Sequence, residues 1–212
     1  GVEQVREVLF DHTQSHLDLE TQVNRTAVRE YDAQQVALPF LIRAVAPNYR
    51  RQSALTRHLG DLLFIWGNRF ALNSERLAEI GMDAQVLVST SERSWAYAWS
   101  GGWLPPDVFS SSDYLQGTQP LAVQLTGLFD RARFSEDAEG RSQIELGEKA
   151  LGTSQLLLVG SSEMFKNEYL YAAGFQHDQF LLNAVAHMAY GEALAELQAR
   201  RPVSRGFAFQ SP

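Results

Sequence analysis

Five short runs of apolar residues predict the β-strands of this chain. Each run is rich in branched side chains that follow one another without regular alternation. Strands that are covered on both faces carry such runs, as in a parallel sheet between two layers of helices. The pattern therefore predicts an α/β domain with a mostly parallel sheet. The runs are VREVLF at 5–10, LLFIW at 62–66, QVLVS at 85–89, LAVQL at 121–125 and QLLLV at 155–159.

Asn73 predicts the first helix. Asparagine is a favoured N-cap residue, and Gly81 lies where a glycine often follows the last turn of a helix. We therefore expect a helix over residues 74–80. Because this helix lies between the second and third apolar runs, it completes a strand, helix, strand unit.

A capping pattern predicts a second helix directly after the third run. Ser89 and Glu92 have the three-residue spacing of a capping box. The helix is expected to begin near Ser91 and to carry Trp95 and Trp99. Glycines and prolines at the following positions break it.

The strongest helical pattern covers residues 178–199 and stops before Pro202. Asn183 lies within an apolar stretch of this helix, so its amide must find hydrogen-bond partners, which we expect in adjacent loops. The apolar stripe of the helix is predicted to consist of Leu181, Val185, Met188 and Leu194.

Two polar stretches, 109–119 and 134–149, are predicted to be loops. The second is charged and has little periodicity, so we expect it to be flexible, with a hairpin tip if its flanking strands are neighbours. The chain shows no internal repeat, and 212 residues fit one domain over 1–212.

Composition narrows the classes of function. A net charge of -7, with basic residues clustered only as isolated pairs such as Arg50 and Arg51, argues against nucleic-acid binding. The absence of cysteine excludes disulfides, thiolate metal sites and a cysteine nucleophile. No run reaches the about 20 apolar residues of a membrane span. The start at Gly1, without an initiator methionine, suggests a fragment of a longer, membrane-anchored protein.

The order of several segments resembles one protein family. A strand ends in Thr-Ser with Trp95 four residues beyond, and a later strand ends in Gly-Ser-Ser-Glu before the helix that bears Asn183. This succession resembles the auxiliary, periplasmic component of ABC transport systems associated with gliding motility. The segments are LTRHLGDLLFIWGNRFAL at 55–72, GMDAQVLVSTSERSW at 81–95, PLAVQLTGLF at 120–129, QLLLVGSSEMFKNEYL at 155–170 and FLLNAVAHMAYGEAL at 180–194.

The resemblance implies a fold and a role. The fold is a Rossmann-like three-layer sandwich, similar to class I glutamine amidotransferase-like domains. The role is that of a non-enzymatic binding module, held outside the cytoplasmic membrane and associated with the permease and ATPase subunits of the same transport system. No cofactor or metal is implied. The chain departs from the family because it begins partway through the expected domain.

A ligand or partner site is predicted at the strand ends. Open α/β sheets bind ligands at the carboxyl ends of parallel strands, where following helix N-termini favour a small anion or carboxylate. Trp95 can form a wall of this site, and a saccharide is a second class of ligand. The same polar residues can instead cap only their own helices. The predicted residues are Asn68, Thr90, Ser91, Trp95, Ser161, Ser162 and Glu163.

A serine hydrolase is the enzymatic alternative. Ser161 or Ser162 follows a predicted strand, which is the position of the nucleophile in α/β-hydrolases. His177 or His187 can be considered as the base. However, Met164 stands where the GxSxG pattern requires its second glycine. We therefore predict that the chain has no hydrolase activity.

Two further sites remain open from the residues alone. Trp95, Trp99 and Trp103 can form a carbohydrate-stacking surface, although no carboxylate pair indicates a glycosidase. His12 and His16 have the i, i+4 spacing that can share a zinc on a helix, but the catalytic glutamate of the HExxH motif is absent. No metal site is predicted.

Overall fold

The structure is a computed structural model of the whole chain, and it describes residues 1–12, 38–109, 116–136, 142–149 and 152–191. Strands lie at all five predicted runs. The first run coincides with β2 (Glu7–Asp11) over residues 7–10, and a short strand β1 (Val2–Gln4) precedes it. The others form β4 (Leu62–Ile65), β6 (Met82–Ser89), β8 (Pro120–Gly127) and β11 (Ser154–Val159).

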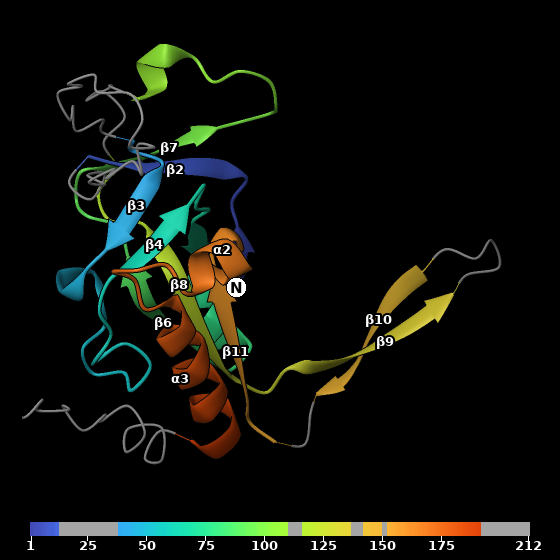
Figure 1. Cartoon of the computed structure of the whole chain (residues 1–212). Coiled ribbons are helices and arrows are strands. Elements are labelled where there is room, and N and C mark those ends of the chain that lie inside the picture. The colour runs from blue at the N-terminus through green and yellow to red at the C-terminus, as the bar shows by residue number, and fades with distance from the viewer. Residues whose placement is uncertain (13–37, 110–115, 137–141, 150–151, 192–212) are drawn as a thin grey trace, which may run out of the picture.

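A three-stranded central sheet has the order β11-β8-β6, and β8 is antiparallel to both neighbours. Four two-stranded ladders surround or extend it (Figure 1), and each of these is antiparallel as well. They pair β1 with β5 (Phe70–Leu72), β2 with β7 (Ser94–Ala98), β3 (Leu41–Ala44) with β4, and β9 (Asp130–Glu136) with β10 (Ser142–Lys149).

The predicted Rossmann-like sandwich with a mostly parallel sheet is therefore wrong. Every strand pair among the described residues is antiparallel. A run of consecutive apolar residues reports burial on both faces of a strand and carries no information about strand direction. The helix between β4 and β6 does not make these two strands neighbours, because β4 pairs with β3 and β6 pairs with β8.

The apolar residues of β8 divide between two separate apolar clusters, which explains why they follow one another in the sequence. Ala122 packs toward α3 (His177–Tyr190), in a cluster with Leu87 and Phe180. Val123 belongs to the cluster on the other face, with Leu77 from α1 (Ser74–Glu79). The central sheet is thus covered on both faces, although by different elements (Figure 1).

The first helix prediction is confirmed and the second is wrong. Asn73 Oδ1 accepts a hydrogen bond from the backbone N–H of Arg76 at 2.9 Å and starts α1. The segment that carries Trp95 is the strand β7, because it pairs along its length with β2. The Ser91 hydroxyl, expected at the start of a helix, donates to the buried carboxylate of Asp11 instead.

The long helix is α3, and the structure describes it as far as Gly191. Its buried side includes Phe180 and Ala184, together with His177, Asn183 and His187. Asn183 donates from Nδ2 to the carbonyl oxygen of Leu55, so the expected bond to a neighbouring loop is confirmed. The predicted apolar stripe faces outward instead: Leu181, Val185 and Met188 are all at least 41% exposed. Leu194 and Pro202 lie outside the described residues.

Much of the predicted loop at 134–149 is a β-hairpin, which corrects that expectation. Within the described part of the chain, strands β9 and β10 pair only with each other, and the hairpin extends away from the central sheet (Figure 1). Residues 137–141 at its tip lie outside the described residues. The other predicted loop begins after the 3-10 helix η2 (Pro106–Phe109), and its residues 110–115 also lie outside.

Shorter helical elements join these strands. They are η1 (Ala46–Asn48), η4 (Glu163–Phe165) and α2 (Asn167–Leu170). No helix among the described residues is both long enough and apolar enough to cross a membrane.

Candidate functional site

The predicted strand ends do meet at one end of the central sheet. The backbone N–H of Asn68 donates to Gly160 O at 2.7 Å, and Gly160 N–H donates to Leu121 O at 2.8 Å. Thr90 N–H donates to Gln119 O at 2.9 Å. Strands β6 and β11 both run opposite to β8, so they point in the same direction and finish together. We call this region the closed end of the sheet.

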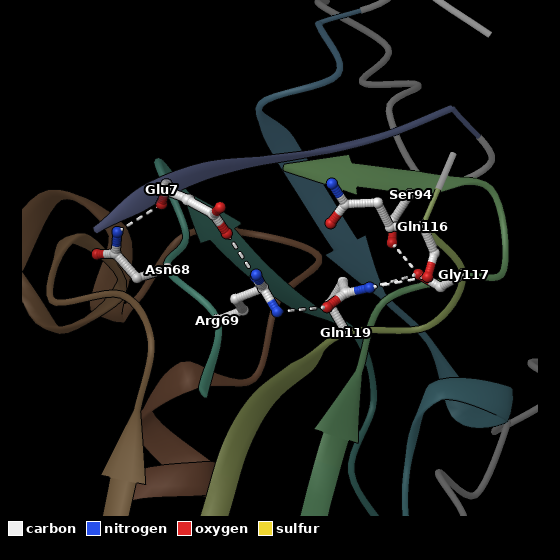
Figure 2. Close-up of polar contacts among 7 residues, drawn as sticks. All are labelled: Glu7, Asn68, Arg69, Ser94, Gln116, Gly117 and Gln119. Atoms are coloured by element: carbon white, nitrogen blue, oxygen red, sulfur yellow. Dashed lines mark hydrogen bonds and ion pairs between the residues drawn. The ribbon is translucent and has the colours of Figure 1, made fainter. Parts of the chain in front are cut away.

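Polar side chains at the closed end bond to one another and to the backbone (Figure 2). Arg69 lies between Glu7 and Gln119, with Nε 2.5 Å from the Glu7 carboxylate and Nη1 3.5 Å from Gln119 Oε1. Asn68 Nδ2 donates to the carbonyl oxygen of Glu7 at 2.7 Å. Ser94 Oγ donates to Gly117 O at 2.6 Å.

Thr90 and Ser91 are bonded in the same way. Asp11 is completely buried and accepts both the backbone N–H and the hydroxyl of Ser91, each at 2.7 Å. Thr90 Oγ1 accepts the backbone N–H of Gln119 at 2.8 Å and lies 2.7 Å from Ser94 Oγ. The hydroxyls predicted to contact a ligand therefore hold β2, β6 and the chain before β8 together.

The Gly-Ser-Ser-Glu segment has a comparable structural role. Ser161 is buried and donates to the carbonyl oxygen of Ile65 at 2.8 Å, which links the ends of β11 and β4. Ser162 precedes η4 without a side-chain capping bond. Glu163 pairs with Lys166 at 2.7 Å. The element that follows β11 is thus a three-residue 3-10 helix and not the N-terminus of a long α-helix.

Both ring nitrogens of His177 are hydrogen-bonded to backbone groups. Its Nε2 accepts the N–H of Leu63 at 2.8 Å, and Nδ1 lies 2.7 Å from the carbonyl oxygen of Tyr169. A nitrogen that accepts from N–H carries no proton, so the neutral ring donates from Nδ1. Burial lowers the pKa of this imidazole. His177 therefore joins α3 to β4 and offers no free nitrogen to a serine.

The tryptophans are separated by their environments. Trp95 is fully buried, stacks on Phe10 with ring centroids 5.3 Å apart, and donates from Nε1 to Val108 O at 2.9 Å. Trp99 and Trp103 are exposed. The three rings thus do not form the shared stacking surface that a carbohydrate site requires.

The proposed histidine pair is only partly described. His12 lies beside Trp95, with ring centroids 4.5 Å apart, while His16 lies outside the described residues. Among the residues that the structure describes, no group of three or more His, Cys, Asp or Glu side chains could hold a metal ion.

The opposite half of the central sheet contains an open polar pocket, which we call the amide pocket. Gln85, Gln124 and Gln155 line it, one from each strand of the sheet. Gln85 lies directly across from Gln124 in the β6–β8 ladder. Gln124 Nε2 also lies 3.3 Å from Gln155 Oε1. The amides therefore form a row across three strands, on the face that α3 covers.

Residues 50–53 and the end of β8 complete the amide pocket. Arg50, Gln52 and Ser53 line it, as does Thr126. The cavity volume is about 320 Å³. This is near the lower limit for pockets that hold small organic ligands, which typically span about 300–1,000 Å³.

His187 of α3 borders the amide pocket and is only 6% exposed. Its Nε2 lies 2.9 Å from the side-chain nitrogen of Gln124. Because an amide nitrogen can only donate, Nε2 accepts and the neutral ring carries its proton on Nδ1. This buried Nδ1 has no hydrogen-bond partner among the described residues. A buried polar atom without a partner is an exception that calls for a bound group or a local role.

The sequence analysis missed this pocket, although a signal was present. Each of the last three apolar runs contains one glutamine: Gln85, Gln124 and Gln155. A polar amide within a run that is otherwise suited to a buried strand costs free energy unless it is hydrogen-bonded. A glutamine in each of three strand candidates therefore indicated polar contacts on the sheet.

Comparisons with known proteins add nothing to this geometry. A scan against protein-family models, a search of curated proteins and a search of solved structures each found no match.

Proposed function

We propose that this chain is a non-catalytic binding module that holds a small ligand in the amide pocket. The observation that carries the proposal is the contrast between this pocket and the serine segment. The pocket offers amide, hydroxyl, guanidinium and imidazole groups to a ligand. In contrast, Ser161 and His177, one of the two candidate nucleophiles and one of the two candidate bases, are bonded to backbone groups.

We further propose that the module acts outside the cytoplasmic membrane, as the auxiliary component of an ABC transport system of the gliding-motility type. The order of the segments from 55–72 to 180–194 supports this proposal. The parallel fold that the resemblance implies is absent, so the proposal keeps the role and the partners and abandons that architecture. The partners are the permease and ATPase subunits of the same system.

The transport role is tested by co-purification. The full-length protein is co-expressed with the permease and ATPase of its system, and the complex is isolated through a tag on the ATPase. We expect the protein to elute with both subunits. If the permease and ATPase remain together while this protein elutes separately, the transport role is wrong.

The absence of catalysis is tested with a fluorophosphonate probe. We expect no stoichiometric labelling of Ser161, because its hydroxyl is buried and donates to Ile65 O. Ser161→Ala and Ser162→Ala serve as matched controls. Labelling that disappears in either variant would falsify the non-catalytic proposal, whatever the outcome of the co-purification.

A further inference from the structure

The amide pocket can recognise hydroxyl groups. The side-chain amides of Gln85 and Gln155 can both donate and accept, as can the hydroxyls of Ser53 and Thr126. Gln124 offers its amide oxygen as an acceptor, because its Nε2 already bonds to Gln155 and His187. A ligand hydroxyl also donates and accepts. Several such groups on one small molecule would match the mixed lining, whereas an apolar ligand would leave buried amides without partners.

The charge of the pocket favours one negative group. Among the described residues that line the pocket, Arg50 is the only one with a permanent charge, and none is acidic. Arg50 forms no ion pair within the described part of the chain. A guanidinium binds a carboxylate through two parallel hydrogen bonds. The net charge of -7 opposes anions at long range, but salt screens that field beyond about 10 Å.

His187 contributes to the pocket wall, with its Nε2 held by Gln124. Its Nδ1 has no acceptor among the described residues, but this atom is buried. The donor capacity that a ligand can reach is therefore that of the exposed Arg50. An ammonium group would find no carboxylate among the described lining residues, and the only ring there is the imidazole of His187, which is bonded to Gln124.

We infer that the amide pocket binds a small open-chain hydroxy acid, with one carboxylate held by Arg50 and its hydroxyls held by the row of glutamines. The inference rests on the proposed binding function and names the ligand class of the same pocket. The cavity of about 320 Å³ suits a molecule of this size.

The test uses gluconate as the probe. Sorbitol is its neutral control, because it has the same open six-carbon chain and lacks the carboxylate, and inorganic phosphate is the control for a simple anion. Binding is followed by chemical-shift changes of backbone amides in the ¹⁵N-labelled protein. We expect gluconate to shift the signals of Gln85, Gln124 and Gln155, and we expect much weaker effects from sorbitol and phosphate.

Adjacent arginines provide a matched pair of variants. Arg50 lines the pocket and Arg51 does not, while both are exposed, so neither substitution should disturb the fold. Arg50→Gln should weaken gluconate binding about tenfold, the size expected for loss of a charge-assisted contact. Arg51→Gln should leave the dissociation constant nearly unchanged. Circular dichroism confirms that both variants are folded.

Several outcomes would overturn the inference. Equal weakening by both variants would indicate nonspecific attraction between charges. Equal binding of sorbitol and gluconate would show that the pocket does not recognise the carboxylate. Binding of phosphate alone would show that it does not recognise the hydroxyls. No shifts at the pocket with millimolar gluconate would contradict the hydroxy-acid class directly. None of these results bears on co-purification with the permease and ATPase, so the two proposals fail separately.

Discussion

At the closed end of the central sheet, where β6 and β11 finish, polar side chains bond to one another or to the backbone. At the end where these strands begin, the amides of Gln85, Gln124 and Gln155 surround the amide pocket. Ser91 is bonded to Asp11 and Ser161 to Ile65 O, whereas His187 Nδ1 has no partner among the described residues. The glutamines of the amide pocket also bond to neighbouring side chains, so the difference lies in their surroundings: they border an open cavity, whereas Ser91 and Ser161 connect packed strands.

The two glycines that flank β11 provide the sharpest test of this comparison. A Cβ at Gly160 would lie 2.1 Å from Asn68 O and 3.0 Å from Leu121 O, while a Cβ at Gly152 would meet no atom within 4 Å. Gly160→Ala must separate backbone segments at the closed end. We expect it to lower the free energy of unfolding by about 3 kcal/mol or more.

Gly152→Ala is the matched control for Gly160→Ala. Its effect should stay within about 0.5 kcal/mol, because the site is open. Urea denaturation of the two variants and the wild-type protein gives both values. Equal stabilities of the two variants would show that the three strand ends are not closely packed at Gly160.

The next largest effect is expected for two aspartates. Asp11 is buried at the closed end and accepts two bonds from Ser91 at 2.7 Å. Asp83, near the start of β6, is exposed and accepts one bond from Gln85 at 3.1 Å. Asp11→Ala should cost about 2–4 kcal/mol because it leaves buried donors unpaired, and Asp83→Ala about 0.5 kcal/mol or less.

The same urea denaturation measures the aspartate pair. Near-equal costs for Asp11→Ala and Asp83→Ala would mean that the bonds to Ser91 add little to stability, and the distinction between the two ends would then fail. A lower stability of Asp11→Ala with an unchanged dependence on urea concentration would place the effect in the folded state.

The positions of the strands with apolar runs could be predicted from the sequence, but strand direction could not. The apolar runs at 62–66 and 121–125 report burial, which is local information. Direction depends on pairing between distant segments, such as β6 with β8. The capping prediction at Ser89 failed for the same reason, because β7 is held by β2 and Ser91 is bonded to Asp11, 80 residues away.

The helix α3 shows why periodicity selected the wrong buried face. Two faces of its sequence were compatible with burial, and the more apolar one, with Leu181 and Val185, is exposed. The buried face carries His177 and His187, whose bonds to β4 and β8 satisfy groups that periodicity alone treats as unsuited to a core. Sequence patterns rank the faces of a helix by polarity. In the folded protein, a face with polar residues can be buried when those residues find hydrogen-bond partners.

The smallest effect in this comparison is a pH dependence that originates at His177. This histidine is fully buried with both nitrogens bonded, and burial lowers the pKa of its ring below the usual value. The unfolded chain therefore takes up a proton near pH 6.5, while the folded protein does so only at lower pH. Between the pKa of His177 in the folded state and its pKa in the unfolded state, the unfolded chain binds more protons than the folded protein. The free energy of unfolding must therefore decrease as the pH falls through this range. Protonation of His177 Nε2 would also place its N–H against the backbone N–H of Leu63, and the hydrogen bond between them would be lost.

His177→Gln separates this contribution from other titrations. A glutamine can still accept from Leu63 N–H through its side-chain oxygen, but it does not titrate in this range. Urea midpoints measured from about pH 7.5 down to about pH 5 should fall less steeply in His177→Gln than in the wild-type protein. The variant is expected to be less stable at neutral pH, where the wild-type bonds are complete, and the difference should narrow as the pH falls. Parallel curves for the two proteins would assign the pH dependence to other groups and would remove His177 from the contacts that hold α3 against β4.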